Sequence, residues 1–189
     1  MSLIEIQDIA FEYGKDARVL DGIDLSIEKG TMTTILGLNG CGKTTMIKLI
    51  AGLMKPSRGE ILIDEISVLS MSDHDRSRHI AYVPQFAMSR IHFKTEDYLA
   101  LSLANQKSPT WEPNDEDKIK VKEYAQKMNI DENKLNRRVD ELSGGERQIV
   151  MICGALLQKA DIIVLDEPTA SLDLKNQHLV LKTLKTLKN

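Results

Sequence analysis

The spacing of apolar and polar residues alternates along the chain between a period of two and a period near 3.6, which predicts alternating strands and helices. Short runs rich in β-branched and other apolar residues predict the strands. These runs are Leu3–Tyr13, Val19–Ile27, Thr33–Leu36, Gly59–Ile63, Ile80–Val83 and Ile162–Leu165. The last of them, IIVL, is entirely apolar, as is typical of a strand in the middle of a parallel sheet.

Apolar residues three and four positions apart predict helices between these strands. After Gly42, apolar residues from Met46 to Leu53 fall on one helical face, and Gly52 with Pro56 marks the end. Further helices are expected over Thr95–Ala104, Asp115–Met128, from Asp140 through Leu157, and over Leu174–Lys188. Strands and helices alternate on either side of a mostly helical stretch, which predicts an α/β core with an inserted helical sub-lobe.

Composition narrows the range of possible functions. The 189 residues carry 25 basic and 28 acidic side chains, a net charge of −3, which argues against a protein whose main partner is a nucleic acid. The sequence holds no run of 18 or more apolar residues, so no membrane span is expected. Its first residues also lack the pattern of a signal peptide. Cys41 and Cys153 lie far apart without a CxxC motif, so we expect neither a zinc site nor a disulfide framework.

A phosphate-binding loop is predicted where the strand expected at Thr33–Leu36 meets the first helix. Residues 37–44, GLNGCGKT, fit the pattern G-x-x-x-x-G-K-S/T. Glycines let backbone N–H groups turn inward around an anion, and the N-terminus of the helix points at the same place. Lys43 would reach the terminal phosphates, and the Thr44 hydroxyl would ligate Mg²⁺. The residues expected to bind nucleotide here are Gly37, Asn39, Gly40, Cys41, Gly42, Lys43, Thr44 and Thr45.

The simpler alternative for this loop is a glycine-rich turn with an exposed lysine.

A disulfide at Cys41 would obstruct the bound nucleotide, which favours a reducing compartment, the cytoplasm.

A second motif follows the apolar run IIVL. Asp166 ends this predicted strand, where a doubly wound sheet presents its ligand site. Four apolar residues followed by Asp-Glu fit the second motif of nucleotide-binding proteins, in which the aspartate holds Mg²⁺. Glu167 is then placed to orient or deprotonate the attacking water. The alternative is a solvated turn or a helix start with Pro168 at its first position.

The stretch LSGGE admits two interpretations. Ser143 with Glu146 three residues later is a capping box, which explains a helix start by itself. Two glycines in a first turn cost about 1 kcal/mol each relative to alanine, and a plain cap does not require them. Bare N–H groups at Gly144 and Gly145 suit a second phosphate contact.

The ordered set of motifs resembles the ATP-binding cassette (ABC) ATPases over essentially the whole chain. LSGGERQ, shortly before IIVLDEP, is similar to the signature of that family. The resemblance implies a P-loop NTPase core with a mostly parallel sheet, an antiparallel β subdomain at the N-terminus and an inserted helical subdomain. We therefore expect one domain, with residues 1–85 and 160–189 as the nucleotide-binding core and residues 86–159 as the helical subdomain.

The resemblance assigns roles to further residues. Tyr13 matches the aromatic residue that stacks on adenine, although an edge-strand tyrosine would look the same. Gln85, in YVPQ, matches the glutamine that contacts Mg²⁺ or the attacking water and senses the membrane partner; a surface turn residue is the alternative. The D-loop, which crosses the dimer interface, is matched by Ser171, Leu172 and Asp173.

The resemblance also implies cofactors and partners. Two such domains pair head to tail around ATP, so that Ser143, Gly144, Gly145 and Glu146 of one copy face the nucleotide of the other. Mg²⁺ would be held by Thr44, Gln85 and Asp166. The partners expected are integral-membrane permease subunits, which would hold the protein at the inner face of the cell membrane.

One feature departs from the family pattern. The family's switch histidine and the strand before it are expected beyond the last residue of this sequence. His178 falls within the last predicted helix, so we expect it to be a surface residue rather than a replacement. The chain is thus expected to be truncated. A module that binds nucleotide without hydrolysing it, or an ABC ATPase without a permease, remains an alternative.

The run SVLSMSDHDRSRHIAYVPQ resembles iron-siderophore, haem and cobalamin importer ATPases.

Overall fold

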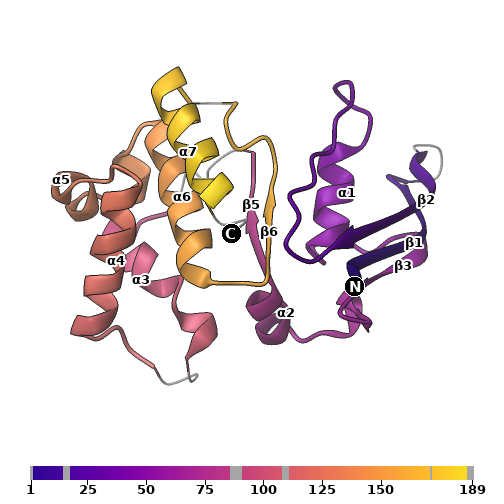
Figure 1. Ribbon diagram of the computed structural model, residues 1–189, viewed down its shortest axis with the longest axis horizontal. Helices are drawn as coiled ribbons and strands as arrows, with labels where there is room; N and C mark the ends of the chain where they lie inside the picture. Colours follow the sequence, from indigo (N-terminus) through magenta and orange to yellow (C-terminus); the bar gives the residue numbers. More distant parts are fainter. Residues whose placement is uncertain (1, 15–17, 86–90, 108–110, 171, 187–189) are drawn as a thin grey trace. The chain divides into compact units, whose positions relative to one another are not determined.

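The chain is described by a computed structural model that covers residues 2–14, 18–85, 91–107, 111–170 and 172–186 (Figure 1). It divides into two compact units, of which the first ends at Arg76 and the second begins at Ser77. The boundary falls within helix α2 (Asp73–His79).

The first unit is built on a four-stranded antiparallel sheet with the order β2-β1-β3-β4. Its strands are β1 (Ser2–Glu12), β2 (Arg18–Glu28), β3 (Arg58–Ile63) and β4 (Ile66–Ser67). Helix α1 (Lys43–Ile50) buries Met46, Leu49 and Ile50, and a 3₁₀ turn, η1 (Val68–Ser70), follows β4. The antiparallel sheet expected at the N-terminus is therefore present.

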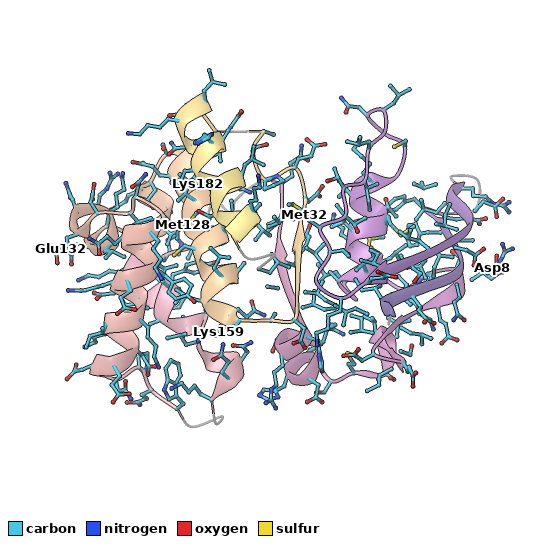
Figure 2. The ribbon with its side chains drawn as sticks, in the orientation of Figure 1. Asp8, Met32, Met128, Glu132, Lys159 and Lys182 are labelled. Carbon is cyan, nitrogen blue, oxygen red and sulfur yellow. The ribbon has the colours of Figure 1, made fainter. Side chains whose placement is uncertain are left out.

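A bulge at Asp8 explains why β1 alternates imperfectly. Ile6 and Ile9 are both buried although three positions separate them, because the register shifts between them on the β2 ladder. Asp8 takes a left-handed backbone (φ 47°), its N–H donates to Asp24 at 2.9 Å, and its carboxylate pairs with Arg58 at 2.8 Å (labelled in Figure 2). A Cβ on the neighbouring Gly59 would lie 2.2 Å from the carbonyl oxygen of Gln7, so glycine is required there.

The strand expected at Thr33–Leu36 is not present, because residues 31–38 form no regular secondary structure. Leu36 is 86% exposed and Leu38 is 85% exposed. A strand needs a neighbouring backbone to complete its hydrogen bonds, and in the described part of the chain neither edge strand, β2 or β4, pairs with this segment. The β-propensity of the run does not supply such a partner, so the prediction was wrong at this point.

The second unit contains a parallel strand pair and the helices that cover it. β5 (Ile80–Val83) runs parallel to β6 (Ile162–Leu165), with Ile80 beside Ile162 and Val83 beside Leu165 (Figure 1). The helices, with two 3₁₀ turns, are α3 (Thr95–Leu101), η2 (Ala104–Gln106), α4 (Asp115–Lys127), α5 (Glu132–Asn136), η3 (Val139–Glu141), α6 (Gly144–Gln158) and α7 (Leu174–Thr186).

Helix α6 lies at the centre of this unit. It contacts β5, α3 and α4, and all of its residues from Gln148 to Leu157 are buried. The expected helices are present, with ends that differ by a few residues; the longest shift is at α6, where the turn η3 precedes the helix itself. Of the last predicted helix, residues 187–188 lie outside the described residues. Among the described residues, every helix is too short or too polar to cross a bilayer.

Candidate functional site

In the first unit, the predicted phosphate loop is folded around its own lysine. The Lys43 ammonium donates hydrogen bonds to the carbonyl oxygens of Gly37 at 3.0 Å and Leu38 at 2.9 Å. The Cys41 N–H closes a turn to the Leu38 oxygen at 3.3 Å. The loop is thus curled at the N-terminus of α1, where the helix dipole favours an anion.

Gly42 is needed at the start of α1 for two reasons. It is the N-cap residue and has a left-handed backbone, with φ 95°. A Cβ at this position would also lie 2.9 Å from the Val19 side chain and 3.0 Å from Leu20. A side chain here would therefore strain the backbone and push the helix start away from β2.

Tyr13, just beyond β1, is held beside this loop. Its hydroxyl lies 3.3 Å from the hydroxyl of the buried Thr45, and its ring meets Phe11 edge to face with 4.8 Å between ring centres. The side chain is still 51% exposed. About half of an anchored aromatic residue is thus exposed to solvent beside the first turn of α1.

In the second unit, three predicted site residues lie at the carboxyl ends of the parallel strands. Asp166 follows β6, is 2% exposed, and extends the ladder by donating its N–H to the Val83 oxygen at 3.0 Å. Gln85 lies beyond β5, and its side-chain amide donates to the Glu167 carboxylate at 2.7 Å. The acidic pair and the glutamine therefore occupy one edge of the sheet, where α/β folds bind ligands.

Glu167 has an unusual backbone conformation. Its φ is 45°, in the left-handed region that costs a non-glycine residue about 1–2 kcal/mol. Such outliers persist where the surrounding structure holds them, and they concentrate at functional sites. The charge of Asp166 also acts on its surroundings: burial first, and then this charge, raise the pKa of Tyr82.

The stretch LSGGE forms the capping box that its spacing predicts. The Ser143 hydroxyl accepts from the Glu146 N–H at 3.3 Å, and the Glu146 carboxylate accepts from the Ser143 N–H at 2.9 Å. This second bond is the main reason that the pKa of Glu146 lies below its usual value. Gly144 and Gly145 open the helix, and a Cβ on Gly144 would meet open space. No contact with the described residues of this unit explains glycine at that position.

A cavity of about 470 Å³ opens beside this turn. Its lining includes Ser143, Gly145, Glu146 and Asp173. Of the predicted D-loop, Leu172 is buried and Asp173 caps α7 by accepting from the Asn176 N–H at 2.8 Å. Ser171 lies outside the described residues.

Two polar residues that contact the predicted site in this unit were not singled out in the sequence analysis. Gln148 is 1% exposed on α6 and donates from its side-chain amide to the Pro84 oxygen at 3.2 Å. Lys134, at the edge of the cavity, lies 3.7 Å from the Glu146 carboxylate. A polar residue at a core-facing position of an otherwise apolar helix was the available signal for Gln148.

Comparison with known proteins decides the family. The model of a family described as "ABC transporter" matches residues 20–170, which is most of the chain. The chain belongs to the ABC transporter family. It is an ABC-type ATPase, and it is the nucleotide-binding subunit of a transporter.

Relatives of this ABC ATPase carry different names. An "Uncharacterized ABC transporter ATP-binding protein" of Methanocaldococcus jannaschii is 35% identical over 97% of this chain and 70% of its own length. A "Probable iron chelatin transport ATP-binding protein" of Helicobacter pylori is 31% identical, over 97% and 71%. The "Lipoprotein-releasing system ATP-binding protein LolD" of Buchnera aphidicola is 36% identical, over 95% and 78%.

A solved ABC structure has the same fold. It is a dimeric, post-hydrolysis ATP-binding cassette bound to ADP and phosphate, and it matches with a TM-score of 0.89 and 27% identity. The match covers 98% of this chain and 83% of that one. The expected α/β P-loop fold is thereby confirmed, and so is the assignment to ABC ATPases.

Proposed function

We propose that this ABC ATPase drives solute import by hydrolysing Mg·ATP, with iron chelates as the solute class. The observation that carries the catalytic part is the hydrogen bond between Gln85 and Glu167 at the carboxyl ends of β5 and β6. It brings together the two side chains that the reaction needs near the attacking water. In this proposal residues 1–85 and 160–189 form the nucleotide-binding core, and residues 86–159 form the helical subdomain.

Each predicted residue has a defined task in the proposed reaction. Lys43 and the loop N–H groups stabilise the negative charge of the phosphates, and Tyr13 stacks on the adenine. Glu167 accepts the proton of the attacking water, and Gln85 orients that water.

The donor set fits Mg²⁺. Thr44, Gln85 and Asp166 offer only hard oxygen ligands, as this ion prefers. The described residues contain no cluster of three or more His, Cys, Asp or Glu side chains that could hold a metal. A site of this kind relies on one or two carboxylates together with the substrate phosphates, which is how Mg²⁺ commonly binds. The bound ion would offset charge on the phosphates.

A second copy of the chain completes the proposed site. The N–H groups of Gly144 and Gly145 begin α6, with open space where a Gly144 Cβ would lie, so a phosphate from another copy can approach the backbone. The dimeric state of the similar cassette supports this arrangement. In this proposal the dimer works at the inner face of the cell membrane, bound to integral-membrane permease subunits.

The similarity to the iron chelatin protein of Helicobacter pylori supports the proposed solute class. The comparable identity to LolD of Buchnera aphidicola supports a second candidate, the release of lipoproteins from a membrane.

Co-purification with the cognate permease, followed by reconstitution into vesicles, separates these functions. The proposal predicts that ATP drives a radiolabelled ferric chelate across the membrane and that the chelate stimulates phosphate release. Stimulation by a lipoprotein instead would favour the second candidate. ATP binding without phosphate release would indicate a non-hydrolysing module, and phosphate release without a permease partner would indicate a soluble ABC ATPase.

A further inference from the structure

Three successive residues at the carboxyl end of β5 are each held by a different hydrogen bond. The Val83 oxygen accepts from the Asp166 N–H, the Pro84 oxygen accepts from the Gln148 side chain, and the Gln85 side chain donates to Glu167. The first and third of these bonds join β5 to the segment after β6. The second joins it to α6, the helix that begins at Ser143, Gly144 and Gly145, which we call the signature turn.

We propose that Gln148 is a positioning residue for ATP hydrolysis, which fixes Gln85 through the carbonyl group of Pro84 and links it to the signature turn. The proposal rests on the function proposed above and names a residue that the sequence analysis did not assign.

The Pro84 carbonyl is an effective point from which to orient Gln85. A peptide unit is planar, so the Pro84 carbonyl and the Cα of Gln85 belong to one rigid group. The hydrogen bond from Gln148, 3.2 Å long, therefore fixes the plane from which the Gln85 side chain departs. That side chain reaches Glu167 at 2.7 Å, so a rotation of this plane would change the contact.

Burial argues that the amide of Gln148 is present for this contact. The residue is 1% exposed within the apolar part of α6, where an apolar side chain of similar length would pack without cost. Its other amide atom, Oε1, is buried and accepts no hydrogen bond from the described residues. A half-satisfied amide is disfavoured in a core, so the Nε2 contact to Pro84 is the feature that accounts for glutamine here.

The helix connects this contact to the signature. Gly144 and Gln148 are four residues apart on α6, so they lie on the same face, one turn from each other. A phosphate that binds the first turn and shifts the helix would carry Gln148 with it. The signature turn of one copy would thus be linked mechanically to Gln85 of the same copy.

The chain offers a matched control at the other end of the same helix and strand. Gln158 ends α6, next to Lys159 (labelled in Figure 2), and its side chain donates to the Ser77 oxygen at 2.6 Å and the Ile80 oxygen at 3.1 Å. Both glutamines thus tie α6 to the backbone beside β5. Of the two, only Gln148 forms its hydrogen bond at the carboxyl end of β5, next to Gln85.

The first test compares Gln148→Met with Gln158→Met in steady-state ATP turnover. We expect Gln148→Met to lower kcat about tenfold or more, with less than about a twofold change in KM, since misplacing a reacting group affects turnover rather than binding. Gln158→Met should leave kcat within about twofold of the parent, and circular dichroism should show both variants folded. Equal losses of kcat in the two variants, or an unchanged kcat in Gln148→Met, would overturn the proposal.

Two further measurements separate this proposal from the proposed function. In a Gln85→Ala background, Gln148→Met should have almost no additional effect on kcat, because it acts through Gln85; additive effects would contradict that route. Hydrogen exchange needs no activity: Gln148→Met should raise deuterium uptake in the peptide containing Gln85, and Gln158→Met should raise it near Ser77 instead. An unchanged uptake at Gln85 would overturn the proposal even if the parent chain released no phosphate.

Discussion

Gln85 and Glu167 are 82 positions apart in sequence, yet the amide of one donates to the carboxylate of the other at 2.7 Å. The parallel register of β5 and β6 explains the meeting, because Val83 pairs with Leu165 and the next residues leave the sheet at the same edge. The contact occupies one oxygen of the proposed catalytic base. The second carboxylate oxygen remains as the acceptor for the proton of a water molecule, so Gln85 can hold the base in place while it acts.

The phosphate loop gives the first prediction. Lys43→Ala removes the ammonium that holds the carbonyl groups of Gly37 and Leu38, and that would bind the terminal phosphates. A charge-assisted hydrogen bond contributes about 1.5–3 kcal/mol, so ATP affinity should fall by about one to two orders of magnitude. Equilibrium binding of a fluorescent ATP analogue measures this. Lys48→Ala, later in the same helix, is the control, and equal affinities of the two variants would contradict the role of Lys43.

The ring of Tyr13 gives the second prediction. Tyr13→Phe keeps the ring and its contact with Phe11 but loses the hydroxyl contact with Thr45, so ATP affinity should change only slightly. Tyr13→Ala removes the stacking surface, which contributes about 1–3 kcal/mol per base in comparable contacts. The ATP dissociation constant should therefore rise about tenfold in Tyr13→Ala, with little change for inorganic triphosphate. An equal loss for both ligands would argue against adenine stacking.

Gly144 separates the stability of the monomer from the proposed dimer site. A Cβ there meets open space, and alanine favours a helix by about 1 kcal/mol over glycine, so Gly144→Ala should keep or raise the thermal midpoint. Turnover should nevertheless fall, because the methyl group would lie where the nucleotide of the second copy approaches the backbone. Thermal unfolding and phosphate release on the same sample test both statements. Unchanged turnover would place the signature turn outside the reaction.

The buried Asp117 predicts an acid-dependent loss of stability. Burial raises the pKa of its carboxyl, but hydrogen bonds from the Asn114 backbone and Trp111 and the ion pair with Lys107 outweigh it and hold the pKa below its usual value. In the unfolded chain the pKa of an aspartate is about 3.9. Because the folded-state pKa of Asp117 is lower, its charge stabilises the fold at pH values above about 3.9, and this stabilisation is lost as the pH falls through the folded-state pKa.

Asp117→Asn should therefore reduce the free energy of unfolding by about 1–3 kcal/mol at pH 7, and the difference from the parent should shrink below about pH 4. Urea denaturation at both pH values measures this. Asp115→Asn, in the same first turn of α4 but with a 99% exposed side chain, is the control. A deficit in Asp117→Asn that persists unchanged at low pH would contradict the proposed role of the charge.

Local signals in the sequence were sufficient for much of the site. The spacing of Ser143 and Glu146 predicts the capping box, because both partners lie within one turn. The end of the IIVL run predicts that Asp166 lies at the edge of a sheet, whereas Gln85 was assigned only through the resemblance to the family. Sequence order alone also identified the family, since several motifs occur in a fixed succession.

Features that depend on distant backbone could not be predicted in the same way. Thr33–Leu36 has the composition of a strand, but a strand also requires a partner, and composition carries no information about one. The bulge at Asp8 depends on the approach of Gly59 from another strand. Gln148 contacts Pro84 across 64 positions, and an isolated glutamine in a helix does not reveal which carbonyl it will reach.

Phosphate release by Glu167→Gln tests the central claim most directly. The amide is nearly the same shape as the carboxylate but is a poor proton acceptor, and a general base contributes about 10²–10⁴-fold to a rate. The account predicts that the variant binds ATP as tightly as the parent chain while its turnover falls at least about a hundredfold. Turnover equal to that of the parent would show that Glu167 is not the base and would contradict the account.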